Sequence, residues 1–289
     1  MLDDKFQLME NSIFPCLWFD GDAHEAAKLY SSAFEDTTIG TVDPMVVIFE
    51  IKGKKFMGLN GGPGFKPNPS ISFFNVCASI QEIDLAWKTL LENGEILMPL
   101  DKYPWNEYYG WIQDKYGVSW QLSLANNNQQ QPDVFPSLLF TGAQNGRAEE
   151  ALNFYTTLFE NSTVDIIAKY QPGEHDVEDH IKYAQFTIND QRIAMMDSSH
   201  NHAFSFSPGV SIVVNCDTQE EIDYLWLNLT EGGREDRCGW CQDAFGVSWQ
   251  IVPSILSKLM SDPKKAPKVM QAFMKMNKFN IQELEKAAL

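Results

Sequence analysis

The chain contains the same segment twice, and this internal repeat constrains the fold more than any other feature. Residues 114–121 read DKYGVSWQ and residues 243–250 read DAFGVSWQ, and a tryptophan lies three residues before each copy. Further matches follow upstream in the same order, back to the segments IFP and VFP that open the two halves. Similarity at a fixed spacing indicates a duplicated structural unit. We therefore predict two related domains.

Length and composition agree with two domains that each have a core. The 289 residues are 44% hydrophobic and 12% aromatic. The formal net charge of −17 argues against nucleic-acid and membrane partners, because both attract cationic surfaces. The chain shows no secretory signal and no apolar run of about 20 residues. We expect a cytoplasmic protein whose five cysteines are reduced.

Hydrophobic periodicity divides each half into two β-α-β-β-β modules. Asp22 is the expected N-cap of the first helix, and Ser79 with Glu82 has the spacing of a capping box that Thr218 and Glu221 repeat. The strands expected in the first half cover residues 13–19, 37–42, 45–51, 54–60, 71–77, 95–98, 108–113 and 118–124.

A polar run, NNNQQQ followed by proline, separates the two halves. An aromatic insertion at residues 99–110 distinguishes the first half, and a charged insertion at residues 171–180 distinguishes the second. The predicted divisions are a first domain at 11–125, a linker at 126–133, a second domain at 134–253 and a helical tail at 254–289.

Four modules in two pairs resemble the vicinal oxygen chelate superfamily of glyoxalases, dioxygenases and bleomycin-resistance proteins. The residues are most similar to its PhnB-like family, also labelled 3-demethylubiquinone-9 3-methyltransferase-like, at 189–197, 204–211, 239–253 and 269–276. The resemblance implies an α+β fold in which each domain forms an eight-stranded curved mixed sheet, or cup. It also implies that the two domains pair as an intramolecular pseudo-dimer. Whether the chain forms a homodimer beyond that stays open.

Metalloenzymes of this superfamily hold an ion in the cup with ligands from the first, fourth and last strands. The matching positions are Pro15, Asn60 and Gln121 in the first domain and Pro136, Asp197 and Gln250 in the second. Only Asp197 is a good ligand, whereas catalytic zinc or iron sites need about three His, Cys or carboxylate groups. We therefore expect no metal. We also expect no cofactor, because the glycine run at 61–64 is typical of a turn.

The second domain contains the favoured site residues. Asp197, His200 and His202 are candidate acid–base groups, unless their loop only hydrogen-bonds to itself. The Gln250 amide is expected either to face a ligand in the cup or to satisfy a buried backbone group. The complete set of predicted ligand contacts is Asp197, His202, Phe204, Phe206, Trp240 and Gln250, with Asn60, Trp111 and Gln121 in the first domain.

Other chemically active residue types are assigned structural roles. Cys238 and Cys241 form a CxxC at the start of a strand, without the helix N-terminus that lowers a thiol pKa in redox sites. His175 and His180 are expected in a solvated hairpin rather than a metal loop. Both copies of the repeated tryptophan, at positions 120 and 249, are expected in the core.

Three functions remain open at this point, and the sequence does not decide whether the protein is an enzyme. The preferred function is binding of a small molecule, of unknown identity, without metal chemistry. The alternative is a metal-assisted enzyme of the glyoxalase or dioxygenase kind, with its site in the second domain. A third function is an interaction role, which would require filled cups and an exposed apolar patch.

Overall fold

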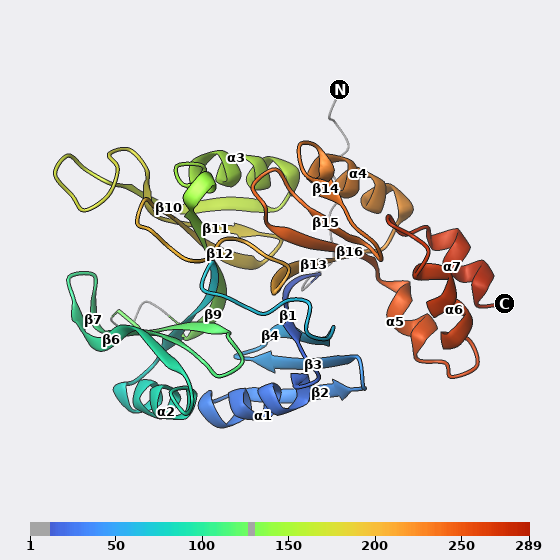
Figure 1. Cartoon of the computed structure of the whole chain (residues 1–289), viewed down its shortest axis with the longest axis horizontal. Coiled ribbons are helices and arrows are strands. Elements are labelled where there is room, and N and C mark those ends of the chain that lie inside the picture. The colour runs from blue at the N-terminus through green and yellow to red at the C-terminus, as the bar shows by residue number, and fades with distance from the viewer. Residues whose placement is uncertain (1–11, 127–130) are drawn as a thin grey trace.

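The structure is a computed structural model and describes residues 12–126 and 131–289. Within these residues, sixteen strands build two eight-stranded mixed sheets, called sheet A and sheet B. Four helices lie along the outer sides of the sheets, and three more form a lobe at the C-terminal end (Figure 1). The expected α+β fold of two tandem glyoxalase-like domains with a helical tail is confirmed. Most of the predicted linker at 126–133 lies outside the described residues.

Both sheets have the same strand arrangement. Two antiparallel strands meet at the centre of each, and a parallel strand flanks each of them. The order in sheet A is β14 (Arg234–Glu235), β15 (Trp240–Gln242), β16 (Ser248–Pro253), β13 (Val210–Cys216), β1 (Ile13–Phe19), β4 (Lys54–Asn60), β3 (Val46–Ile51) and β2 (Thr37–Val42). The order in sheet B is β10 (Ser162–Lys169), β11 (Ile181–Ile188), β12 (Gln191–Ser198), β9 (Asp133–Thr141), β5 (Ile71–Cys77), β8 (Ser119–Leu124), β7 (Asn106–Gln113) and β6 (Glu95–Tyr103).

Each sheet takes one module from each half of the chain, so the expectation of one complete sheet per domain is wrong. Sheet A joins the first and fourth modules through β1 and β13, and sheet B joins the second and third through β5 and β9. The chain crosses between the sheets at residues 61–70 and 199–209, which contact each other where Asn68 donates to the Ser205 carbonyl at 3.1 Å. The predicted pseudo-dimer is confirmed, and its interface runs through the middle of both sheets.

The helices begin largely where the sequence predicts. They are α1 (Ala23–Ala33), α2 (Ile80–Leu90), α3 (Ala148–Leu158), α4 (Gln219–Thr230), α5 (Ile255–Met260), α6 (Ala266–Phe273) and α7 (Ile281–Ala287). Ser79 and Thr218 cap α2 and α4 as expected, and Thr218 completes the capping box with Glu221. Asp22 makes no side-chain cap, however. The side-chain Oδ1 of Asn60, at the end of β4, accepts instead from the Ala23 N–H at 3.0 Å.

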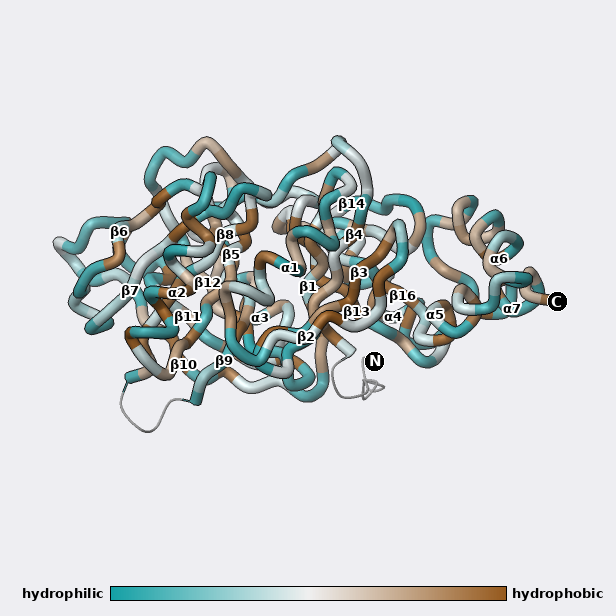
Figure 2. Tube along the Cα trace, turned by 90° about the horizontal axis from the view of Figure 1, so that it is seen from below, coloured by the Kyte–Doolittle hydropathy of each residue, from teal (hydrophilic) through white to brown (hydrophobic). Residues whose placement is uncertain are grey.

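One face of each sheet packs against the helices and forms the core. Trp120 and Trp249 are 0% and 1% exposed there, which confirms their predicted place. The indole N–H of each donates to a buried carboxylate, Asp114 at 3.1 Å and Asp243 at 2.8 Å. The apolar residues of the central strands stand out in Figure 2. Both copies of the DxxGVSW segment make this same indole–carboxylate contact, so the repeated segment forms part of the core.

Two peripheral segments differ from the expected pattern. The aromatic insertion at 99–110 is not a loop, because β6 and β7 extend through it as a long hairpin. The tail docks beside β15, where the N–H groups of Cys238 and Gly239 donate to the carbonyls of Met276 and Asn277. No helix among the described residues is long and apolar enough to cross a bilayer.

Candidate functional site

The face of sheet A that points away from the helices is the first candidate site, called cup A. Side chains alternate along a strand, so every second residue of β1 reaches this face and the others enter the core. The apolar residues at the centre of cup A are Phe14, Cys16 and Val213, which are buried, surrounded by Met57, Leu59 and Val252, which are half-buried.

Three polar side chains from three strands meet at the floor of cup A. Gln250 Nε2 donates to Ser211 Oγ at 3.0 Å, and both residues are placed to donate to the Cys16 sulfur, which opposes the rise in its pKa. Burial raises the pKa of the Cys16 thiol to about 12, so it is neutral near pH 7. No group in the described part of the chain donates to the Gln250 carbonyl oxygen. One end of this amide is therefore available to a bound molecule.

Aromatic residues form the rim of cup A. Trp18 meets Trp240 edge-on at 5.7 Å and Phe65 at 5.1 Å between ring centroids. Trp18 Nε1 donates to the Gly62 carbonyl at 2.7 Å, and a Cβ on Gly61 would come within 2.2 Å of the Trp18 ring. The close approach of the Trp18 ring thus accounts for the glycine at position 61.

A lysine adds positive charge to cup A. Lys55 lies on β4 with its Nζ 4.0 Å from the centroid of the Phe14 ring. Burial lowers the pKa of Lys55, and the charge of Glu50 on β3 opposes that effect. No carboxylate of the residues that the structure describes lies within 4 Å of this Nζ.

The corresponding face of sheet B, called cup B, repeats the polar pair but completes it internally. Gln121 Nε2 donates to Ser72 Oγ at 2.7 Å, as Gln250 does to Ser211. In cup B, however, Tyr109 Oη donates to the Gln121 carbonyl at 2.5 Å. Both ends of the Gln121 amide are therefore occupied by the protein itself.

Aromatic rings cover the centre of cup B. Phe74 stacks on Phe135 at 5.5 Å, and Tyr183 meets Phe74 edge-on at 6.1 Å. Arg192 lies over the Phe135 ring and pairs with Asp133 at 2.6 Å. The cation of cup B is thus neutralised, whereas Lys55 in cup A is not.

The rim of cup B comes from β7 and the β6–β7 hairpin. Trp111 Nε1 donates to Ser119 Oγ at 2.6 Å. Tyr103 stacks on Trp105, which is 57% exposed at the hairpin tip. At the floor, Ser137 stands where cup A has Cys16, and its buried hydroxyl has no partner among the described residues.

The structure gives Asp197 a role in the backbone rather than in a cup. Its side chain points to the helices, because Asp197 pairs with Phe140 of the core. Its carboxylate accepts from the N–H groups of Gly146, Ala148 and Ile181 at 2.7–3.3 Å. Burial raises the pKa of Asp197, and these N–H groups oppose the shift. Asp197 therefore anchors the start of α3 as Asn60 anchors α1, and we withdraw both as ligand contacts.

The other residues predicted near Asp197 lie in the crossing segment between β12 and β13. His202 Nε2 is 2.8 Å from Ser198 Oγ, and the His200 and His202 rings are 6.4 Å apart. The Phe204 carbonyl accepts from Thr141 Oγ1 at 2.9 Å, and the Phe206 ring packs on core residue Phe140. The predicted second-domain site is thus divided, because Gln250 and Trp240 belong to sheet A.

The positions that hold a metal in related enzymes do not converge here. Pro15 and Pro136 point into the core, since they pair with Ile212 and Phe73 there. Only the two glutamines reach a cup, and they reach different cups. Within residues 12–126 and 131–289, no three His, Cys, Asp or Glu side chains are close enough to hold a metal ion. These residues do not fit the metal that the superfamily uses.

The remaining candidates have structural surroundings. Cys241 is buried in the core, while the Cys238 Sγ lies on the tail, 3.8 Å from Met274 Sδ. Both thiols are free, and burial raises the pKa of each. The charged insertion at 171–180 lies between β10 and β11 as a loop, as predicted. There the His180 ring packs on Gly146.

Sequence reasoning missed most of the cup A residues. Alternation along the strand IFPCLWF puts Phe14, Cys16 and Trp18 on one face, which its continuous apolar sequence does not reveal. Ser211 and Lys55 were missed because they belong to strands that are distant from β1 in the sequence. Only the folded sheet brings Ser211 next to Cys16 and Lys55 next to Phe14.

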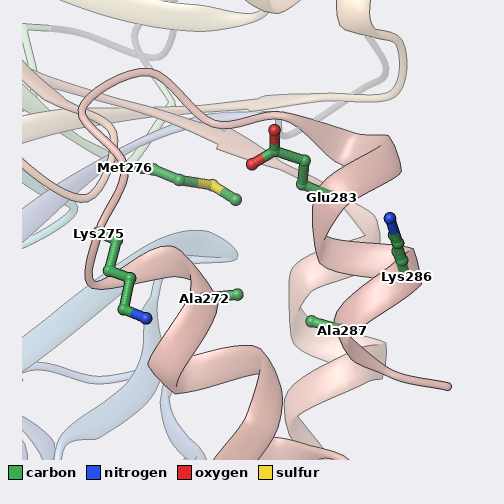
Figure 3. A pocket seen from close by; sticks show the side chains of 6 residues that line it. All are labelled: Ala272, Lys275, Met276, Glu283, Lys286 and Ala287. Carbon is green, nitrogen blue, oxygen red and sulfur yellow. The ribbon is translucent and has the colours of Figure 1, made fainter.

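A shallow hollow lies outside both cups, between α6 and α7 (Figure 3). Its lining residues are Ala272, Lys275, Met276, Glu283, Lys286 and Ala287. The charged members are exposed, so the hollow offers no buried polar group that would select a ligand.

The chain is similar to several proteins of known structure. A PhnB protein of Bacillus cereus is 34% identical over 39% of this chain and 98% of its own, with a TM-score of 0.38. A Staphylococcus aureus protein is 33% identical over 41% of this chain and 100% of its own, with a TM-score of 0.19. Glyoxalase I of Zea mays shares the fold over 87% of this chain and 97% of its own, at a TM-score of 0.55 and 11% identity.

A search of curated proteins found no significant match. The sequence model of the family described as 3-demethylubiquinone-9 3-methyltransferase matches the chain twice, at residues 11–123 and 132–252. These matches cover most of both halves, and the chain belongs to that family.

Proposed function

We propose that the protein binds a small molecule in cup A and does so without a catalytic metal. The observation that carries the proposal is the difference between two matched glutamines. Tyr109 occupies the carbonyl of Gln121 in cup B, and no described residue occupies that of Gln250 in cup A. An amide oxygen that has no protein donor can accept a hydrogen bond from a bound molecule.

The surroundings of Gln250 suit a molecule with an apolar body. Met57, Leu59 and Trp240 are half-buried, so a ligand that covers them removes apolar surface from water. Ligand sites in proteins commonly combine such apolar walls with a few placed polar groups. Trp18 and Trp240 at the rim add flat surfaces against which a ring can pack.

A metal-assisted enzyme is the weaker alternative. It would need the second-domain cluster, and there Asp197 is committed to three backbone N–H groups. The likeness to glyoxalase I concerns the fold alone and does not transfer chemistry. We also propose a cytoplasmic location, supported by the five free cysteines and the acidic composition.

The test is a screen of small molecules by thermal shift on the wild type and on Gln250→Leu, with Gln121→Leu as the matched control. We expect compounds that raise the melting temperature of the wild type and of Gln121→Leu. The same compounds should have little effect on Gln250→Leu. Stabilisation that depends on Gln121 instead would place the site in cup B.

A further inference from the structure

We propose that the ligand of cup A is the anion of an apolar carboxylic acid, whose carboxylate Lys55 binds and whose far end donates a hydrogen bond to Gln250. This inference rests on the proposed function and names its ligand class. It follows from three observations: a row of side chains across sheet A, an unpaired cation at one end of that row, and an open amide at the other.

The row crosses the four central strands of sheet A. Strand pairing places Phe14 opposite Val213, and Val213 opposite Gln250. Lys55 lies at the other end of the row. Cys16 of β1 pairs with Met57 of β4. Two residues earlier on each strand, the Lys55 Nζ lies over the Phe14 ring. The row therefore reads cation, aromatic ring, aliphatic side chain, amide.

The cation at the end of this row lacks a partner that its counterpart has. Arg192 occupies the same place in cup B, over the Phe135 ring, and Asp133 neutralises it at 2.6 Å. The Lys55 Nζ has no described carboxylate within 4 Å. Glu50 faces it from the neighbouring strand but forms no ion pair, and its side chain is exposed. A partly buried ammonium group without a counterion is a ready site for an anion.

The overall charge of the protein makes this position selective. With 39 acidic residues against 22 basic ones, the surface repels anions in general. An anionic ligand therefore gains most at a cation that is both unpaired and partly buried, as Lys55 is. The negative end of such a molecule at Lys55 also offsets the cost of keeping that ammonium group partly buried.

The row fixes the length of the ligand. Neighbouring strands are about 4.8 Å apart, so two strand spacings put roughly 10 Å between the Phe14 and Gln250 backbones. The Lys55 ammonium lies over Phe14, and the Gln250 side chain shortens the gap from the other side. A phenyl ring with a short acid chain and a hydroxyl opposite matches that span.

The test uses 3-(4-hydroxyphenyl)propanoate as the probe and isothermal titration calorimetry on the full chain. Lys55→Met should weaken binding about tenfold to a hundredfold, the effect of losing one charge-assisted contact. Lys54→Met is the matched control, because this neighbour lies on the opposite side of the same strand. It should leave the affinity unchanged.

Two analogues of the probe test its carboxylate and its hydroxyl group independently. The primary amide, which has no charge, should bind the wild type and Lys55→Met equally. The analogue without the phenol hydroxyl, 3-phenylpropanoate, should keep its dependence on Lys55 and lose its dependence on Gln250.

The outcomes distinguish this inference from the proposed function. If Gln250→Leu weakens the probe but Lys55→Met does not, cup A binds small molecules and the carboxylate assignment is wrong. If none of the three compounds binds, the ligand class is also wrong, while the thermal-shift screen still decides on binding in cup A. Binding that neither variant alters would contradict both proposals.

Discussion

Truncation of Trp249 to alanine should destabilise the chain strongly. The side chain is 1% exposed and packs on Tyr155 at 5.3 Å and Phe159 at 6.0 Å, so losing it costs about 3–5 kcal/mol. Its indole N–H also donates to Asp243 at 2.8 Å. A buried carboxylate that loses a partner costs about 1–3 kcal/mol more. We therefore expect the free energy of unfolding to fall by about 4–8 kcal/mol.

The same loss should appear across the whole chain rather than in one half. Both sheets contain strands from both halves, joined at β1–β13 and β5–β9. Urea unfolding, followed by circular dichroism and tryptophan fluorescence, should therefore show a single transition. Trp120→Ala has the matched surroundings in the first half and should shift that same transition.

The control is Leu227→Ala, because Leu227 is 70% exposed and its loss should change stability by less than about 0.5 kcal/mol. Two separate transitions, each moved by only one of the tryptophan variants, would refute this reasoning. That result would mean that the two halves unfold independently despite their shared sheets.

Three further predictions concern single residues. Asp197→Ala leaves three backbone N–H groups without their acceptor and should lower the free energy of unfolding by about 2–4 kcal/mol in urea, while binding in cup A stays unchanged. A loss of binding without a loss of stability would restore Asp197 as a site residue. Lys52→Met leaves Glu82 buried without its ion pair, and should cost about 3–5 kcal/mol in the same assay. A second change, Glu82→Gln, should recover much of that loss, and no recovery would argue against the pair. Because burial raises the pKa of Cys16 to about 12, iodoacetamide at pH 8 should modify the half-exposed Cys238 in the folded protein and leave Cys16 intact, as read by peptide mass spectrometry. Early modification of Cys16 would show that its thiol ionises more readily than this pKa allows.

Local patterns in the sequence predicted the local structure well. The capping residues Ser79 and Thr218 do cap their helices, because a cap depends on residues only three positions apart. The repeated tryptophans lie in the core for a similar reason, since the whole DxxGVSW segment closes its own hydrogen bonds around an aspartate.

The pairing of modules could not be predicted in this way. Each module has the same periodicity, and nothing local distinguishes a β1–β13 sheet centre from a β1–β5 one. The assignment of Asp197 and Gln250 to one site depended on that pairing, and the two residues lie in different sheets. The sequence also does not show the free carbonyl of Gln250 or the unpaired charge of Lys55. Each depends on which side chains from other strands lie beside it in the folded protein.

The most direct test of the account is a crystal structure of the protein after soaking with a compound selected in the thermal-shift screen. The account predicts electron density for that compound in cup A, within hydrogen-bond distance of the Gln250 carbonyl, while Tyr109 still occupies Gln121 in cup B. A compound bound only in cup B, or bound in the crossing segment around His202, would contradict it.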